Sequence, residues 1–305
     1  MSLIVDVLSG GVRGGTSIMY GALGETVSER AGVINLGTEG SMLMGALGGY
    51  IVCVETGNPW LGALAGALAG AALSLLHAYL VVWRGASQFA SGLTLLFLAL
   101  GLTSLFGATY VGKPVDGFSR WDVPLLSDIP VIGTVLFQQD PLVYLSFAIV
   151  PFIWWLLFKT RAGLLIRTAG ERSESLTVHG YSVKAVRAGA VTAGGFLAGI
   201  GGAHLSIAYA NAWFENMVSG RGFIAVALVI FAVWSPIRVM GGAYLFGMAL
   251  ALGSALQARG YNVNQFALDA IPFVLTLAVL ALLGKKTVSS SPAELKKVFE
   301  NAPPT

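Results

Sequence analysis

The stretch ERAGVINLGTEG, residues 29–40, places charged residues, an asparagine and glycines at the start of a long apolar segment, Val33–Val54. A helix needs about 20 apolar residues to cross the hydrocarbon core of a bilayer. From Val33 onward the pattern predicts such a helix, which puts Asn35 and Glu39 four residues apart on one face. Because a carboxylate inside lipid is costly unless it is paired or hydrated, these polar residues need a partner.

The composition of the whole chain is that of a membrane protein. Of its 305 residues, 55% are hydrophobic and 11% are charged, and the mean hydropathy is +0.76. Soluble domains carry about 25% charged residues, because charge solvates their surface. The sequence therefore predicts an all-α integral membrane protein, a polytopic bundle of helices. Cys53 is the only cysteine, so no disulfide can form within the chain.

Apolar segments recur along the chain and predict about eight or nine transmembrane helices. The first, near residues 12–23, is weaker and interrupted by glycines, so a span and a re-entrant or interfacial piece both stay open. Phe223–Trp234 is short and ends before Pro236, which favours a tilted helix or one half of a broken pair. The clear candidates are Val33–Val54, Trp60–Trp83, Phe89–Val111, Leu142–Phe158, Ala185–Ala210, Val239–Leu256 and Phe266–Leu283.

Basic residues predict the orientation. The loop Lys159–Arg187 holds six lysines and arginines, and short loops of this kind stay on the cytoplasmic side. This orientation places Gly112–Asp140 outside. We expect one transmembrane domain over residues 1–284, with a cytosolic loop at about 159–187. A cytosolic tail over residues 285–305 would contain a short helix, Ala293–Glu300.

Glycines are frequent, at 40 residues, and some stand four apart on a predicted helix. In lipid, small residues let helices approach closely and pack backbone to backbone. We expect this role for Gly62, Gly66 and Gly70, and for Gly195 and Gly199.

Several kinds of chemistry have no motif in the sequence. There is no phosphate-binding loop and no HExxH metal motif, and no serine lies in a GxSxG frame. The histidines, His77, His179 and His204, are far apart in the sequence. We therefore expect no catalytic residue, no metal site and no cofactor in this chain, and nothing points to nucleic acid. Ionisable residues inside the spans are also few, which argues that the energy for any transport comes from elsewhere, such as a separate ATPase.

Two interpretations of Asn35 and Glu39 remain open. Asn35 can donate a hydrogen bond to Glu39, which would make a polar clamp between helices. Alternatively, the two side chains line a path for a polar solute through the membrane.

Three motifs in order resemble one family. They are GETVSERAGVINLGTEGSMLMGA (24–46), KTRAGLLIRTAGERSESLTVHGYSVKAVR (159–187), and GRGFIAVALVIFAVWSP (220–236) with the LFG that follows. The chain resembles the ABC importer permeases of the branched-chain amino acid, simple sugar and nucleoside family, and most of all the nucleoside-type subunits. The family's pattern in the second motif is matched by Thr160, Arg161, Gly163, Arg167, Gly170, Glu171, Gly180 and Lys184.

The resemblance implies a coupling helix in the basic loop that docks on a partner ATPase. Glu174, Leu176 and Gly180 match the EAA-x-x-x-G spacing of importer permeases, although the later Leu-Pro of that signature is missing. We expect Ser173 to cap the helix, Glu174 to suit its N-terminal end, and Gly180 to end it. Leu176 and Val178 would dock in an ATPase groove. Gly170 and Glu171 of the preceding motif belong to the same candidate coupling site.

The resemblance also implies partners and a location. A second permease subunit, expected to be a different chain, would complete the path. A double-domain ABC ATPase would bind ATP and Mg²⁺, and an extracytoplasmic binding lipoprotein would deliver the solute. The expected location is the bacterial plasma (inner) membrane, and the expected solute is a nucleoside. A ribose-like simple sugar stays an alternative, as does, from another class, an ATP-independent secondary carrier.

Overall fold

The computed structural model describes residues 2–261 and 291–300, together with residues 264, 267–268, 270–272, 274, 277–278 and 281 between them. Half of the residues of the expected span Phe266–Leu283 therefore lie outside the described residues.

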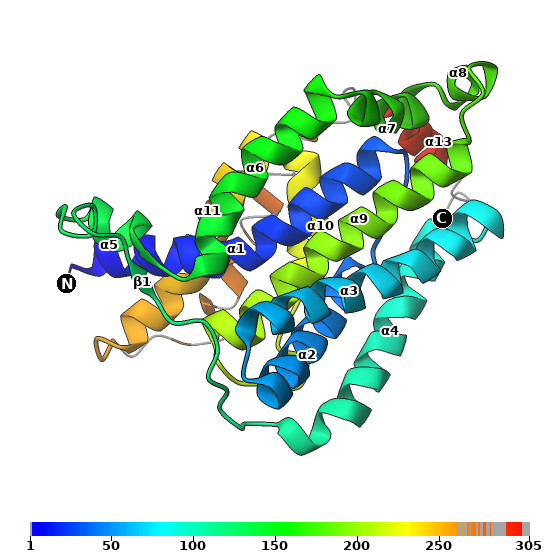
Figure 1. Ribbon diagram of the computed structural model, residues 1–305. Helices are drawn as coiled ribbons and strands as arrows, with labels where there is room; N and C mark the ends of the chain where they lie inside the picture. The colour runs from blue at the N-terminus through cyan, green and yellow to red at the C-terminus, as the bar shows by residue number, and fades with distance from the viewer. Residues whose placement is uncertain are drawn as a thin grey trace.

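The described chain is mostly helical (Figure 1). Two short strands, β1 (Trp121–Asp122) and β2 (Gln138–Gln139), pair antiparallel, so the structure adds a small β-ladder to the predicted all-α fold. The longer helices are α1 (Leu3–Arg30), α2 (Thr38–Thr56), α3 (Pro59–Ala78), α4 (Gln88–Gly107), α6 (Pro141–Lys159), α9 (Val183–His204) and α11 (Pro236–Gln257). The shorter elements are η1 (Tyr79–Trp83), η2 (Ala108–Tyr110), α5 (Ile132–Leu136), α7 (Arg161–Glu171), α8 (Ser173–Val178), η3 (Leu205–Tyr209), α10 (Arg221–Phe231) and α13 (Ala293–Glu300).

Within the described residues, five helices are long and apolar enough to cross a membrane. They are Pro59–Trp83, Gln88–Tyr110, Pro141–Lys159, Val183–Tyr209 and Pro236–Gln257. Each matches a segment predicted from the sequence. The protein is thus a polytopic helical membrane protein.

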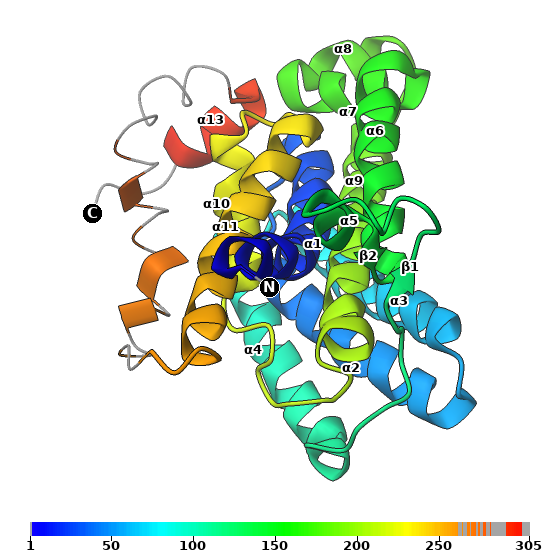
Figure 2. The ribbon, with the colours of Figure 1, turned by 90° about the vertical axis from the view of Figure 1, so that its left-hand side faces the viewer.

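The first helix is continuous, whereas the sequence alone allowed either a span or a re-entrant or interfacial piece near residues 12–23. α1 has 28 residues, which corresponds to a length of about 42 Å at 1.5 Å per residue. It lies in the middle of the bundle and packs against α9, α10 and α11 (Figure 2). Its glycines are contact points, since a Cβ atom at Gly24 would lie 3.2 Å from the Cα atom of Gly194 on α9. The helix faces protein on most sides, which explains why its apolar signal was weak.

The predicted start of the second helix was wrong. α2 begins at Thr38 rather than Val33, and residues 31–37 form turns and irregular backbone. Gly32 has a φ of +85°, a left-handed conformation that glycine adopts at little cost. Asn35 therefore lies before the helix and does not share a helical face with Glu39.

The predicted close packing of glycines is confirmed. A Cβ atom at Gly66 would lie 2.8 Å from the Cβ atom of Ala203, and one at Gly70 would lie 2.7 Å from the Cα atom of Gly199. The backbones of α3 and α9 are therefore in contact, as small residues allow.

The two ends of the bundle differ. At one end, α7, α8 and α13 gather near the C-terminal end of α1 (Figure 1). At the other end, α5, β1 and β2 lie near the N-terminal part of α1 (Figures 1 and 2). The basic loop Lys159–Arg187 and the loop Gly112–Asp140 are predicted to lie on opposite sides of the membrane, and they occur at opposite ends of the bundle.

Candidate functional site

Asn35 belongs to a buried hydrogen-bond network that the sequence did not reveal. Its backbone N–H donates to Glu25 Oε1 at 2.7 Å, and its side-chain Nδ2 donates to Ser74 Oγ at 3.1 Å. Thr38 Oγ1 donates to Glu25 Oε2 at 3.0 Å. The network joins α1, the turn before α2, and α3. Glu25, four residues before Glu29 in an apolar helix, was the signal in the sequence that was missed.

Glu39 holds the start of another helix. The backbone N–H groups of Gly220 and Gly222 donate to Glu39 Oε1 at 2.7 Å and to Oε2 at 2.6 Å. The residue is only 3% exposed. A carboxylate at a helix N-terminus interacts favourably with the unpaired N–H groups and the helix dipole. Glu39 therefore joins α2 to α10, whereas Asn35 hydrogen-bonds elsewhere.

The other end of α10 is held at the end of α1. Trp234, just beyond α10, donates from Nε1 to Glu29 Oε2 at 2.5 Å. Arg30 donates from Nε and Nη2 to the carbonyl oxygen of Trp234 at 3.3 Å and 3.1 Å. The polar residues of the 29–40 stretch thus hold both ends of α10, by way of Glu29, Arg30 and Glu39.

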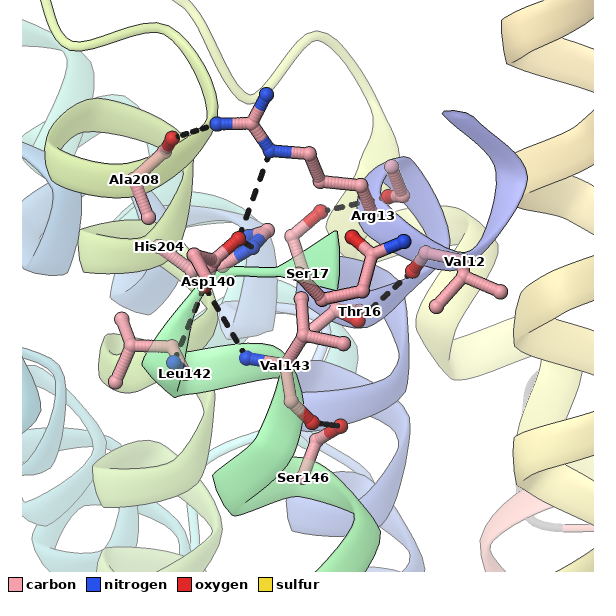
Figure 3. Close-up of polar contacts among 12 residues, drawn as sticks. Val12, Arg13, Thr16, Ser17, Asp140, Leu142, Val143, Ser146, His204 and Ala208 are labelled. Atoms are coloured by element: carbon pink, nitrogen blue, oxygen red, sulfur yellow. Dashed lines mark hydrogen bonds and ion pairs between the residues drawn. The ribbon is translucent and has the colours of Figure 1, made fainter. Parts of the chain in front are cut away.

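A further polar cluster lies where α6 begins (Figure 3). Asp140 Oδ1 accepts hydrogen bonds from the N–H groups of Leu142 at 3.1 Å and Val143 at 3.2 Å, so it caps α6. Its Oδ2 lies 3.5 Å from Arg13 Nε on α1 and 3.4 Å from His204 Nε2 on α9. Because Asp140 and His204 are fully buried, this cluster ties α1, α6 and α9 together away from water.

At the opposite end, the candidate coupling segment consists of two helices. α7 and α8 are separated at Arg172, whose φ and ψ are −148° and 75°. Ser173 is the first residue of α8 rather than its cap, and its hydroxyl donates to Glu294 Oε1 at 3.4 Å. Glu174 lies in the first turn, as expected.

Gly180 ends α8 in the predicted way. Its φ is +77°. The N–H of Tyr181 donates to the Leu176 carbonyl at 2.9 Å, and the N–H of Gly180 donates to the Thr177 carbonyl at 3.0 Å. This pair of hydrogen bonds is a Schellman motif, in which a left-handed glycine terminates a helix.

The two apolar side chains of α8 point to different surroundings. Leu176 is 3% exposed and is buried within the chain, whereas Val178 is 83% exposed. The structure therefore corrects the expectation that Leu176 docks in a partner's groove. Val178 is the apolar side chain of α8 that is available to a partner.

Gly170 and Glu171 make contacts within the chain. A Cβ atom at Gly170 would lie 3.1 Å from the backbone nitrogen of Gly32, so glycine lets α7 approach the end of α1 closely. Glu171 Oε2 accepts a hydrogen bond from the backbone N–H of Ala293 at 3.3 Å, at the start of α13. Both residues thus join the basic loop to the rest of the protein.

The C-terminal helix occurs at the predicted residues and packs on this loop. Glu294 Oε2 lies 3.0 Å from Arg187 Nη2 of α9. Arg187 also donates to the carbonyl oxygens of Ala31 at 3.2 Å and Ala169 at 3.0 Å. Leu295 is completely buried. The α13 helix is therefore part of the folded cytoplasmic end in the predicted orientation, rather than a free extension.

Comparison with known proteins places these features in a family. Residues 8–282 match the family model described as "Branched-chain amino acid transport system / permease component". The chain is 40% identical over 299 residues to the putative glucose ABC transporter permease protein TsgC13 of Haloferax volcanii, covering 96% of this chain and 89% of the relative. It is 37% identical over 285 residues to the nucleoside ABC transporter permease protein NupC of Lactococcus lactis subsp. cremoris, covering 88% and 90%.

A third relative is the guanosine ABC transporter permease protein NupQ of Bacillus subtilis. It is 36% identical over 281 residues, covering 86% of each chain. No solved structure matches this chain. The family match over most of the chain agrees with the helical membrane fold, and it makes the protein a transport component rather than an enzyme. The chain therefore belongs to the ABC transporter permease family of the branched-chain amino acid transport systems.

Proposed function

We propose that this permease forms, with a second permease subunit, a path for an uncharged polar solute, and that the solute is a nucleoside. The observation that carries the proposal is that the buried carboxylates of the chain are paired with groups of the chain itself. The carboxylates of Glu25, Glu29 and Glu39 each accept hydrogen bonds from the chain itself, and Asp140 contacts Arg13 and His204. A cationic solute needs negative charge at membrane depth, and these carboxylates already have partners within the chain.

Relatives support the choice of solute. Two of the relatives described above are named for nucleosides or guanosine. The relative named for glucose is putative in that role and has higher identity, so a sugar is the second candidate. Both classes are neutral and carry hydroxyl groups.

Several features support an ATP-driven importer in a bacterial plasma (inner) membrane. The helices α1 and α2, the five long apolar helices and the segment Phe266–Leu283 would give eight spans, with α10 as a half-length element. In the proposed orientation α8 faces the cytoplasm and docks on a double-domain ATPase, which binds ATP and Mg²⁺. A lipoprotein would deliver the solute from outside, and the second permease subunit would be a different chain.

Solute uptake tests the proposal. The complete transporter, expressed in cells that lack their own nucleoside uptake, should accumulate radiolabelled guanosine or adenosine. Excess unlabelled nucleoside should abolish this uptake and excess glucose should not. Uptake of glucose instead would identify the sugar alternative. Transport by this chain alone in proteoliposomes, without ATPase or binding protein, would contradict an ATP-driven subunit and favour a secondary carrier.

A further inference from the structure

The half-length helix α10 begins deep within the protein. It has 11 residues, which gives a length of about 16 Å at 1.5 Å per residue. Its C-terminal end lies beside Glu29 and Arg30, at the end of α1. In the proposed orientation this end lies at the cytoplasmic face. Since a bilayer core is about 30 Å thick, the N-terminal end of α10 would then lie near the middle of the membrane. Contact between Gly21 and Ala225 agrees with this depth, because Gly21 is nine residues before Arg30 on α1.

The chain reaches this depth as irregular backbone. After η3, residues 210–220 form bends and turns rather than a helix. The first part is paired with another loop, because the N–H of Gly112 donates to the Trp213 carbonyl at 2.9 Å and the N–H of Val115 donates to the Asn211 carbonyl at 3.0 Å. Beyond Trp213, the segment Phe214–Ser219 continues to Gly220, where Glu39 holds the start of α10.

Polar side chains of this segment are exposed in the single chain. Glu215, Asn216 and Ser219 are all exposed, as is the apolar Phe214 before them, whereas neighbouring Val218 is buried. The backbone N–H of Ser219 donates to the Asn216 carbonyl at 3.1 Å, which closes a turn. By contrast, the exposed face of α4 carries apolar side chains, such as Phe97 at 68% and Leu105 at 71% exposure. The exposed face of α4 is therefore suited to contact with lipid, whereas the polar side chains of Phe214–Ser219 are suited to water.

Irregular backbone at membrane depth occurs where it is buried in protein or lines a water-filled cavity, and it does not face lipid. We propose that Phe214–Ser219 lines a water-filled part of the translocation path, next to the second permease subunit. This inference rests on the proposed function. Glu39 acts as a positioning residue for this wall, because its carboxylate occupies the N-terminus of α10 and sets where the segment ends. The N–H groups of Gly220 and Gly222 are thereby already paired with this carboxylate.

Cysteine accessibility tests the inference in the complete transporter. Cys53 is first replaced by serine, and single cysteines are then introduced as Glu215→Cys, Ser219→Cys and Phe97→Cys. Spheroplasts are treated with a charged, membrane-impermeant methanethiosulfonate, both at rest and with ATPase turnover arrested by vanadate. The cysteines at 215 and 219 should react roughly tenfold faster or more than the cysteine at 97, because the reactive thiolate forms in water and not in lipid. Labelling at position 219 should also reduce uptake, and excess solute should slow the labelling.

The outcomes separate this inference from the proposed function. If the Cys53→Ser parent imports nucleoside or sugar but positions 215 and 219 react as slowly as position 97 in both states, the inference is wrong and the function stands. If the parent imports neither solute class, the proposed function is wrong, and the labelling rates still report whether the segment faces water. The Glu215→Cys variant keeps the test valid if Ser219→Cys, at a residue with a φ of +50°, fails to fold.

Discussion

At the scale of single residues, the buried carboxylates of this permease act mainly between segments of its own chain. Glu39 accepts hydrogen bonds from Gly220 and Gly222, and Glu29 accepts one from Trp234. An ionised side chain at membrane depth is stabilised by such donors. The geometry favours the clamp interpretation of Glu39 and adds that its partner is α10 rather than Asn35.

Replacing Glu39 by Gln should weaken this contact. Glutamine keeps the shape but has a single acceptor oxygen, so one of the two glycine N–H groups would face an amide NH₂ group. We expect a loss of about 1–3 kcal/mol for the unsatisfied buried group, seen as lower abundance in the membrane and a lower unfolding temperature in detergent. Glu55→Gln, at an exposed carboxylate, is the control and should leave both unchanged. Normal abundance with lost uptake would instead support a role in the path, and normal uptake with normal abundance would contradict both roles.

At the scale of helices, glycines decide how closely the central helices approach. Gly199 on α9 faces the backbone of α3, and a Cβ atom there would lie 2.9 Å from the Cα atom of Ala67. Gly189 lies on the same helix, but no atom lies within 4 Å of its added Cβ. The two positions form a matched pair for testing the packing.

Gly199→Ala should therefore destabilise the protein and Gly189→Ala should not. Overpacking a tight interface costs about 1–3 kcal/mol, while Gly→Ala in an open helical position gains up to about 1 kcal/mol. The unfolding temperature of the purified protein in detergent measures both effects. Equal unfolding temperatures for the two variants would show that contact between α3 and α9 does not limit stability.

The coupling proposal also belongs at this scale. α8 ends in a Schellman motif and presents Val178 to solvent, while Leu176 packs inside. An exposed apolar side chain on a short, well-terminated helix suits docking in a groove. A charge at Val178 would be placed in that groove, and an unpaired buried charge is strongly unfavourable.

Val178→Asp should accumulate normally in the membrane but no longer co-purify with the ATPase, and uptake should stop. Leu176→Asp differs, because its charge would enter the interior of the loop and reduce the abundance of the protein itself. Thr168→Ser, a small change at a half-buried residue of α7 that keeps the hydroxyl donating to the Leu164 carbonyl, is the control for both. Retention of the ATPase and of uptake by Val178→Asp would exclude α8 as the docking element.

At the scale of the whole molecule, the two ends of the bundle carry different structures. The basic loop packs with α13 and the end of α1 through Arg187, Glu294 and Gly170. At the opposite end lie β1, β2 and α5, next to the contact between Asp140 and Arg13. The bias of Lys and Arg to cytoplasmic loops predicts an orientation with α8 inside.

Thiol labelling tests this orientation in a Cys53→Ser background. A cysteine at Ser119, in the exposed loop before β1, should react with an impermeant reagent added to intact spheroplasts. In protein expressed without the ATPase, a cysteine at Val178 should react after the membrane is permeabilised and not before. The reverse pattern would overturn the proposed orientation, and permeabilised samples control for the intrinsic reactivity of each cysteine.

Much of the fold was predictable, because hydropathy and length act locally. The segments that form α3, α4, α6, α9 and α11 are long and apolar enough to be recognised from the sequence as candidate membrane spans. The glycine stop of α8 and the helix Ala293–Glu300 also follow from nearby residues. The central helix α1 was weaker in the sequence because its neighbours are protein rather than lipid, and hydropathy does not report on neighbours.

The sequence by itself determined the membrane class, most spans, the family resemblance and the location of the candidate coupling loop. Only the tertiary structure decided which residues meet, because partners such as Glu39 and Gly220 are 181 residues apart and no local periodicity encodes such a contact. In the tertiary structure, Asn35 also lies outside α2, Leu176 is buried, and α13 packs on the basic loop. In each case a segment distant in the sequence decides the outcome through its shape and its hydrogen-bonding groups. That segment becomes a neighbour only after the helices have packed.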